Sequence, residues 1–176
     1  MNYENFNPRA FLLAQARELL TQAANAAMAD GSLPQAELPA FITEIPADRK
    51  NGDVASNMAM AGARAWHKAP KMIAEAILAH LPSLQDTCWD RAEVAGPGFI
   101  NLYTGADWLS TVVLAAATNP EYGRTNYGSG QKYNVEFVSA NPTGPMHMGN
   151  ARGGALGDCL AAVLDWAGYQ VTREFY

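Results

Sequence analysis

Residues 135–153 read VEFVSANPTGPMHMGNARG, and this segment organises the C-terminal part of the chain. The apolar residues at its start predict a strand over 133–138, and the glycines and prolines that follow predict a loop over 139–149. An apolar helix is expected over 151–167 and a second strand over 170–176. Together these elements predict one βαβ unit, in which the two strands normally lie parallel.

The loop brings polar side chains to the N-terminus of a helix, where free backbone N–H groups and the helix dipole favour anions. Gly144 and Gly149 allow close approach to the backbone, and Arg152 adds positive charge. His147 and Asn150 are expected to face one ligand from the first helical turn. We therefore expect the loop to bind the phosphates of a nucleotide. It is not a P-loop, because no Gly-Lys-Ser/Thr follows the glycines.

A single βαβ unit does not complete a domain, because a parallel sheet needs further strands and helices on both faces. The sequence therefore predicts that the chain is a fragment that lacks most of a second domain. Residues 119–132 contain an Asn-Pro pair and three glycines, a composition typical of a linker. We expect a first domain over 1–118, a linker over 119–132 and a truncated second domain over 133–176.

Residues 1–118 mix helices and strands without a regular alternation, which is typical of an α+β domain. Asn7 and Pro8 predict the start of a long helix, whose apolar residues recur on one face up to Gly31. The further expected elements are a strand over 41–45, helices over 54–68, 70–81 and 106–118, and a hairpin with strands over 88–95 and 99–103. Asp53 is expected to cap the helix that follows it.

The composition is typical of a globular chain, because 49% of the 176 residues are hydrophobic and 16% are charged. No apolar run approaches the roughly 18–20 residues of a membrane span. The N-terminus lacks the basic and apolar segments of a secretory signal. Cys88 and Cys159 lie far apart without partner histidines, which disfavours a zinc motif and a disulfide scaffold. We expect a cytoplasmic protein without a membrane segment or a bound metal.

The net charge of −5 is unevenly distributed along the chain. Residues 49–71 carry a net charge of +4, whereas residues 1–48 carry −4 and residues 72–176 carry −5. This basic segment has two interpretations. It is a solvated helix face that favours solubility, or it contacts the phosphates of a nucleic acid. Charge alone favours the first interpretation.

Five segments carry a resemblance to a known family. Residues 140–150, ANPTGPMHMGN, resemble the HIGH signature of class I aminoacyl-tRNA synthetases, in the long form typical of arginyl-tRNA synthetases. Residues 135–139 and 168–176 are similar to the strands on either side of that signature. Residues 51–60, NGDVASNMAM, and residues 94–102, VAGPGFINL, are similar to the additional N-terminal domain of the family. The resemblance therefore extends to both sides of the expected linker.

The resemblance implies an α+β N-terminal domain with helices packed on a small antiparallel sheet, followed by the first βαβ unit of a Rossmann-like class I synthetase catalytic domain. It implies an arginine–tRNA ligase, cytoplasmic and monomeric at full length. Such an enzyme activates L-arginine with ATP, accompanied by Mg²⁺, and transfers the arginyl group to tRNA(Arg). This chain alone is expected to be inactive, because the sequence contains no KMSK-type loop or anticodon-binding domain.

Two alternatives stay open from the residues. The chain is alternatively a non-catalytic tRNA- or RNA-binding module derived from a synthetase, and continuation of the gene into a KMSK loop would separate this from the enzyme. A different nucleotidyltransferase with a histidine loop is a third interpretation, but it leaves the N-terminal segments unexplained.

The resemblance also implies roles for the residues of the loop. His147 and Asn150 would stabilise the charge that develops on the ATP phosphates, which makes them the catalytic candidates. Gly144 and Gly149 belong to the same ATP-binding loop, and Gly149 would let the adenosine lie close to the backbone. The family has a histidine where this chain has Asn150. Asparagine keeps a neutral donor but loses the option of positive charge, and we interpret it as a variant of an active site.

For the amino-acid substrate, the resemblance implies Glu136, Ser139 and Asn141. Glu136 matches the family's acidic contact to the guanidinium group, whose fork suits a carboxylate. Ser139 and Asn141 match positions near the head group of the arginine. Position alone favours the alternative interpretation, in which Glu136 is an ordinary carboxylate at a strand end.

For the tRNA, the resemblance implies Phe99 and Asn101, which match positions that meet a base of the D-loop. An aromatic ring stacks on an unpaired base, and an amide reads its edge. Alternatively, Phe99 is a core residue beside a tight turn. Lys68 and Lys71 of the basic segment are the expected phosphate contacts on the same domain.

Overall fold

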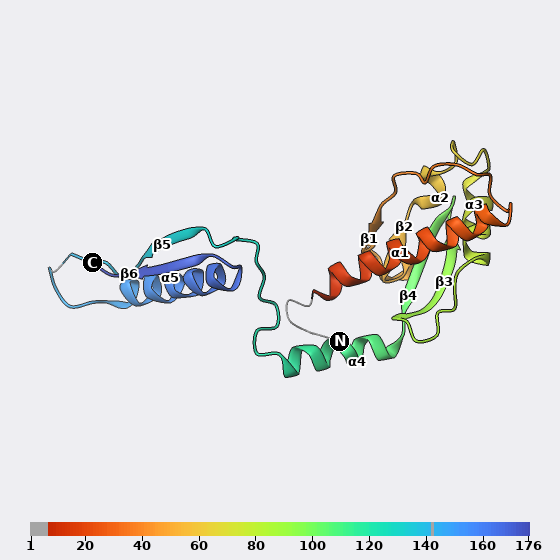
Figure 1. Ribbon diagram of the computed structural model, residues 1–176. Coiled ribbons are helices and arrows are strands. Elements are labelled where there is room, and N and C mark those ends of the chain that lie inside the picture. The colour runs from red at the N-terminus through yellow and green to blue at the C-terminus, as the bar shows by residue number, and fades with distance from the viewer. Residues whose placement is uncertain (1–6, 142) are drawn as a thin grey trace. The chain divides into compact units, whose positions relative to one another are not determined.

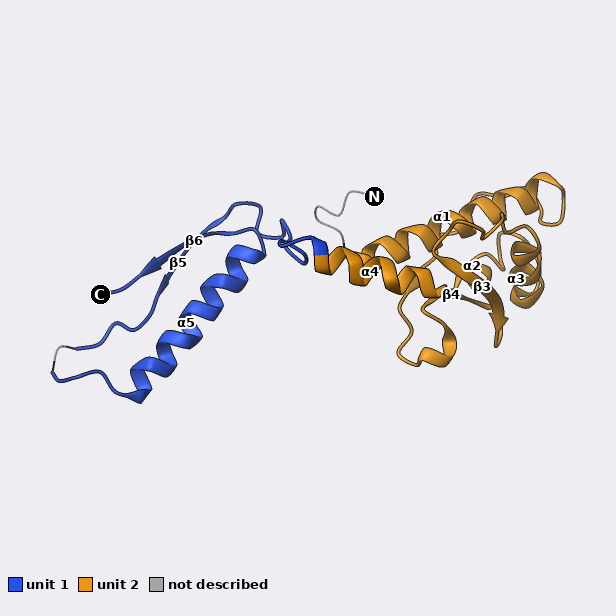
Figure 2. Ribbon diagram, turned by 90° about the horizontal axis from the view of Figure 1, so that it is seen from below, with its two compact units in different colours: residues 1–6, 118–176 blue, residues 7–117 orange. Residues whose placement is uncertain are grey.

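The computed structural model describes residues 7–141 and 143–176 (Figure 1). Their contacts group into two compact units, one of residues 7–117 and one that contains residues 118–176 (Figure 2). In this described part of the chain, no helix has both the length and the apolar character that crossing a membrane requires.

Helix α1, Pro8–Ala29, begins where the sequence predicts. The Asn7 side chain accepts a hydrogen bond from the Ala10 backbone N–H at 3.0 Å, and Pro8 occupies the first helical position, which needs no donor. The helix buries one apolar face, formed by Leu12, Ala16, Leu19, Leu20, Ala23, Ala24, Ala27 and Met28. The predicted apolar stripe of this helix is confirmed.

The first unit contains a small antiparallel sheet of four strands, β1 (Thr43–Glu44), β2 (Val54–Ser56), β3 (Trp89–Ala95) and β4 (Phe99–Thr104). Their order is β1-β2-β4-β3, and β3 with β4 forms the predicted hairpin. β1 is shorter than the predicted strand over 41–45. Helices α3, Pro70–Ala79, and α4, Ala106–Thr118, form close to their predicted bounds. The prediction of helices with a small antiparallel sheet is confirmed.

The predicted helix over 54–68 is wrong in its first part. Residues Val54–Ser56 form β2, which pairs with β1 and β4 and is buried throughout. The Asp53 carboxylate accepts hydrogen bonds from the N–H and hydroxyl groups of Thr104 at 2.8 and 2.9 Å, so it holds β4 and does not cap a helix. The helix that follows, α2, is only Met58–Ala61. A short segment buried on both faces shows no alternation, which hides its strand character in the sequence.

The core of this unit lies where α3 contacts α1 and α2 and where all three helices contact the sheet. Trp66 is completely buried there, and its indole N–H points to the sulfur of Met28 at 3.4 Å. Gly62 makes room for the ring, because a Cβ at this position would lie 2.1 Å from it. The first unit is therefore closely packed around a large aromatic side chain.

The second unit contains β5 (Lys132–Glu136), α5 (Met148–Trp166) and β6 (Gln170–Glu174). The two strands pair in parallel, with Lys132 opposite Gln170 and Glu136 opposite Glu174. The helix connects them, as the sequence predicts. It starts earlier than the predicted residue 151 because His147 caps it.

Residues 119–131, which belong to the predicted linker, contain neither helix nor strand. Backbone hydrogen bonds nevertheless tie them to the end of α5. The Thr125 N–H donates to the Trp166 carbonyl at 2.9 Å. The Gly128 N–H donates to the Ala167 carbonyl at 2.8 Å. This segment therefore packs on the βαβ unit and is not a free tether.

Candidate functional site

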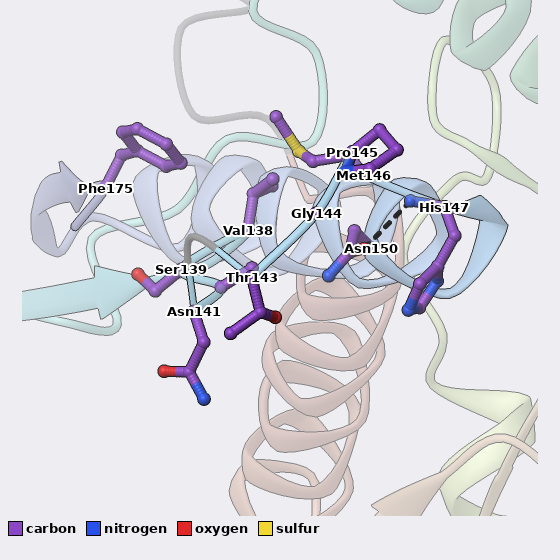
Figure 3. Close-up of a pocket in the computed structure, with 11 residues that line it drawn as sticks. Val138, Ser139, Asn141, Thr143, Gly144, Pro145, Met146, His147, Asn150 and Phe175 are labelled. Atoms are coloured by element: carbon purple, nitrogen blue, oxygen red, sulfur yellow. Dashed lines mark hydrogen bonds between the residues drawn. The ribbon is translucent and has the colours of Figure 1, made fainter.

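A cavity of about 550 Å³ lies beside the loop that connects β5 to α5 (Figure 3). Its lining includes five of the residues predicted for ATP and arginine, namely Ser139, Asn141, Gly144, His147 and Asn150. Residue 142 of the same loop lies outside the described residues. In the described ranges, no group of three His, Cys, Asp or Glu side chains is placed to hold a metal ion.

His147 and Asn150 hold the start of α5 through reciprocal hydrogen bonds. His147 is the N-cap residue, one position before the first turn, and its Nδ1 accepts from the Gly149 N–H at 3.0 Å. The Asn150 Oδ1 accepts from the His147 N–H, also at 3.0 Å. These bonds use one acceptor of each side chain, so the His147 Nε2–H and the Asn150 amide N–H₂ are left as donors. Both lie at a helix N-terminus, where an anion is favoured.

Gly149 is needed for the position of the His147 ring. A Cβ at residue 149 would lie 2.8 Å from the His147 Cε1, so a larger residue would displace the imidazole from its hydrogen bond. In this structure the His147 imidazole fills the space beside Gly149 in which the sequence predicts a close approach of an adenosine. At Gly144 no atom lies within 4 Å of the Cβ position, so the loop is open there.

Two further glycines position the start of the loop, and the sequence reasoning missed them. The Phe137 side chain lies against Gly157, and a Val138 methyl group lies against Gly154. A Cβ at these glycines would be 2.3 and 2.9 Å away from those side chains. Val138 also has φ +65°, an uncommon value for a β-branched residue. The spacing of Gly154 and Gly157 by one helical turn is the signal that indicates a close strand–helix contact.

The residues predicted for arginine are only partly brought together. Ser139 and Asn141 line the cavity, and the Ser139 hydroxyl accepts a hydrogen bond from the Tyr176 N–H at 3.1 Å. Glu136 lies at the end of β5 opposite Glu174, is exposed, and does not belong to the cavity lining. Of the three residues predicted to bind arginine, Ser139 and Asn141 therefore share the cavity and Glu136 does not.

A second cavity of about 430 Å³ lies in the unit of residues 7–117, and Phe99 and Asn101 of β4 both line it. Phe99 is 36% exposed, whereas Asn101 is 2% exposed. Within the described residues, the Asn101 amide makes no hydrogen bond. No buried side-chain N or O atom of the described residues lacks a hydrogen-bond partner, so the polar atoms of this amide are accessible from the cavity. The cavity thus combines an accessible aromatic ring with a side-chain amide that is available to a ligand.

The two lysines predicted to contact phosphates have different surroundings. The Lys68 ammonium donates to the Ser32 carbonyl at 2.6 Å, so it holds the segment after α1. Lys71 is exposed in the first turn of α3. It follows Pro70, which lies against Gly98 in the turn between β3 and β4. Lys71 is thus accessible to a phosphate, whereas Lys68 has a contact within the fold.

Residues 14–104 match the family model described as Arginyl tRNA synthetase N terminal domain. The match covers just over half of the chain and includes the four-stranded sheet and the second cavity. The first unit is therefore an N-terminal domain of the aminoacyl-tRNA synthetase class.

Curated relatives narrow this class. The chain is 49% identical over 163 residues to the arginine–tRNA ligase of Acetivibrio thermocellus, covering 92% of this chain and 29% of the relative. It is 51% identical over 158 residues to the arginine–tRNA ligase of Moorella thermoacetica, covering 89% of this chain and 28% of the relative. The chain belongs to the arginyl-tRNA synthetase family, as its motifs predict, and it spans less than a third of the length of these relatives.

Two solved structures are also similar to the chain. The arginyl-tRNA synthetase from Plasmodium falciparum has a TM-score of 0.49 at 19% identity, over 90% of this chain and 30% of that one. The arginyl-tRNA synthetase from Thermus thermophilus has a TM-score of 0.40 at 25% identity, over 89% of this chain and 24% of that one.

Proposed function

We propose that the chain is the N-terminal part of an arginine–tRNA ligase. That enzyme activates L-arginine with ATP, which enters with Mg²⁺ on its phosphates, and transfers the arginyl group to tRNA(Arg). Residues 1–118 are its tRNA-contacting domain, and residues 133–176 begin a Rossmann-like catalytic domain. Residues 119–132 are the linker between these two domains. The identity of about half of the aligned residues to curated arginine–tRNA ligases supports this proposal. The enzyme is proposed to be a cytoplasmic monomer.

The observation that carries the catalytic part is the donor pair at the start of α5. When the arginine carboxylate attacks the α-phosphorus of ATP and the bond to the departing pyrophosphate breaks, negative charge increases on the phosphate oxygens. The His147 Nε2–H and the Asn150 amide are already oriented by the cap, so they stabilise that charge without reorganising. Gly144 leaves the loop open for the nucleotide beside them.

For the amino acid, Ser139 and Asn141 are proposed to contact the head group, because both line the same cavity as the donor pair. Glu136 is proposed to bind the guanidinium group. Its carboxylate is exposed and makes no hydrogen bond within the described residues, so it is available for a bidentate contact.

For the tRNA, Phe99 and Asn101 are proposed to hold one unpaired D-loop base in the second cavity. The exposed ring offers a stacking face, and the Asn101 amide, which makes no hydrogen bond within the described residues, is available to the base edge. Lys71 is proposed to contact a nearby phosphate, and Lys68 contributes through the position of its segment.

ATP–pyrophosphate exchange by the full-length ligase tests the catalytic part. His147→Ala and Asn150→Ala are each expected to lower the exchange rate by about 10²–10³, the effect of removing one preorganised donor. Asn150→Asp keeps the oxygen that caps α5 but has no amide donor, so it separates catalysis from capping. Asn126→Ala, in an exposed loop of the same unit, is the matched control and should keep the wild-type rate. Normal exchange by Asn150→Asp would reduce the role of residue 150 to capping.

A further inference from the structure

The second cavity has another polar wall that the proposed function leaves unused. Asn51 ends the 3₁₀ turn Arg49–Asn51 and lines the cavity together with Phe99 and Asn101. Asn51 is exposed, and its side-chain amide makes no hydrogen bond within the described residues. Two side-chain amides that make no hydrogen bond within the described residues therefore border the same cavity as one aromatic ring.

Anchors on both sides of Asn51 hold its segment against β4. On one side, the Lys50 carbonyl accepts a hydrogen bond from the Tyr103 hydroxyl at 3.1 Å. On the other side, the Asp53 N–H donates to the Leu102 carbonyl at 2.9 Å. Asn51 is thus fixed between two attachments to the same strand and does not belong to a free loop.

Gly52 brings this segment unusually close to Asn101. It has φ +88°, and a Cβ there would lie 2.7 Å from the Leu102 carbonyl oxygen and 3.4 Å from the Asn101 Cβ. Only glycine combines this backbone conformation with this approach. The Asp48 side chain caps the turn before it. The backbone positions of Asn51 and Asn101 are therefore set before any ligand binds, which lowers the entropy cost of binding.

We propose that Asn51 is a second base-reading residue of this cavity, and that it restricts which D-loop base binds there. The inference rests on the proposed function of Phe99 and Asn101. Stacking on Phe99 tolerates any base, because every base has a π-face. Each amide offers both donors and an acceptor to the base edge. With two amides from different segments, a wrong base leaves a polar group unpaired, and this raises discrimination.

The test uses tRNA(Arg) transcripts that carry each of the four bases at one D-loop position, titrated with the full 176-residue chain. Asn51→Ala is expected to lower the affinity ratio between the best and worst base by about tenfold, the effect of losing one good edge contact. The salt dependence should not change, because no phosphate contact is lost. Asn51→Asp, which keeps the side-chain shape, should change the order of preference. Asn25→Ala on the exposed side of α1 is the matched control.

The outcomes separate this inference from the function it rests on. A wild-type ratio in both Asn51 variants, with a lowered ratio in Asn101→Ala, would overturn the role of Asn51 and leave the proposed function standing. Equal binding of all four bases by the wild-type chain, with no effect of Phe99→Ala, would remove the proposed function and the inference together. A uniform loss for all bases with a reduced salt slope would make Asn51 a backbone contact and also overturn the inference.

Discussion

The unit of residues 7–117 encloses its large apolar side chains, whereas the unit of residues 118–176 leaves many of its own exposed. Leu20 and Trp66 in the first unit are completely buried. On α5, Leu156 is 72% exposed and Val163 is 65% exposed, and Ala161 is the one described apolar side chain of the second unit that is buried. The first unit is therefore stabilised by its own core. The second keeps its shape mainly through parallel strand pairing, a helix cap and close glycine contacts.

This difference shows how each cavity is held in place. Asn101 stands on a strand whose neighbours Ile100 and Leu102 are completely buried, so a packed core fixes its position. The position of the loop between β5 and α5 depends on the hydrogen bond with which His147 caps α5 and on the contact of Phe137 with Gly157. The exposed apolar face of α5 also leaves surface for further elements, which a parallel sheet requires.

The largest effect that tests this comparison comes from shortening a leucine in each unit. Leu20→Ala is expected to lower the free energy of unfolding of the first unit by about 2–5 kcal/mol, because it leaves a cavity in a closed core. Leu160→Ala, at a position 50% exposed on α5, should change stability by no more than about 0.5 kcal/mol. Urea unfolding followed by tryptophan fluorescence measures both. Equal losses would show that the second unit has a core of comparable strength.

The next effect concerns the glycine contacts of the second unit. Gly157→Ala places a Cβ 2.3 Å from Phe137, and we expect overpacking to cost about 1–3 kcal/mol. Gly153→Ala on the same helix meets nothing within 4 Å and should stabilise α5 by roughly 0.5–1 kcal/mol through helix propensity. Hydrogen exchange of the β5 and β6 amides measures the two changes. Unchanged protection in Gly157→Ala would mean that Phe137 does not hold the strand on the helix.

Local signals made part of the fold predictable. Asn7 with Pro8, Pro70, and the turn over 96–98 mark helix and hairpin ends within a few neighbouring residues, and α1, α3 and the hairpin follow them. β2 escaped prediction because its stability comes from pairing with β4, more than forty residues later in the chain. Its short buried sequence does not differ in pattern from a helix.

The candidate site shows the same limit. Residues over 139–150 lie close in space because they lie close in sequence, so their grouping was predictable. That His147 caps α5 was not, because histidine is not among the usual N-cap residues. The bond from Lys68 to the Ser32 carbonyl joins distant segments, and charge patterning alone cannot reveal it. The sequence also could not reveal that Glu136 lies outside the cavity lining, because this depends on where β5 ends.

The smallest expected effect is a pH dependence confined to the first unit. His80, after the last turn of α3, places its Nε2 2.6 Å from the Asp30 carboxylate at the end of α1, and its Nδ1 lies 2.7 Å from the Ala76 carbonyl. The bond to Ala76 and then the bond to Asp30 raise the pKa of His80 above its usual 6.5. The Ser32 N–H, followed by His80, lowers the pKa of Asp30 from 3.8 to about 2.

The sign of the dependence follows from these two shifts. A raised pKa in the folded state gives His80 a contribution that is fully present below pH 6.5 and is lost as the pH rises through the folded-state pKa. A lowered pKa gives Asp30 a contribution that is present above pH 3.8 and is lost as the pH falls toward about 2. The pair therefore stabilises the contact between the ends of α1 and α3 most strongly between pH 3.8 and 6.5.

Urea midpoints of the wild-type chain and of His80→Gln, compared across pH, measure this contribution. Glutamine cannot become charged, so the wild type should exceed the variant most at about pH 5, and the difference should shrink in alkaline solution. His67→Asn, which changes an exposed histidine of the same unit, should follow the wild-type profile. Unfolding of the βαβ unit should not respond to His80→Gln, because the contact between His80 and Asp30 joins two helices of the first unit only. A difference that stays constant from pH 5 to alkaline solution would show that His80 acts through packing and not through its charge.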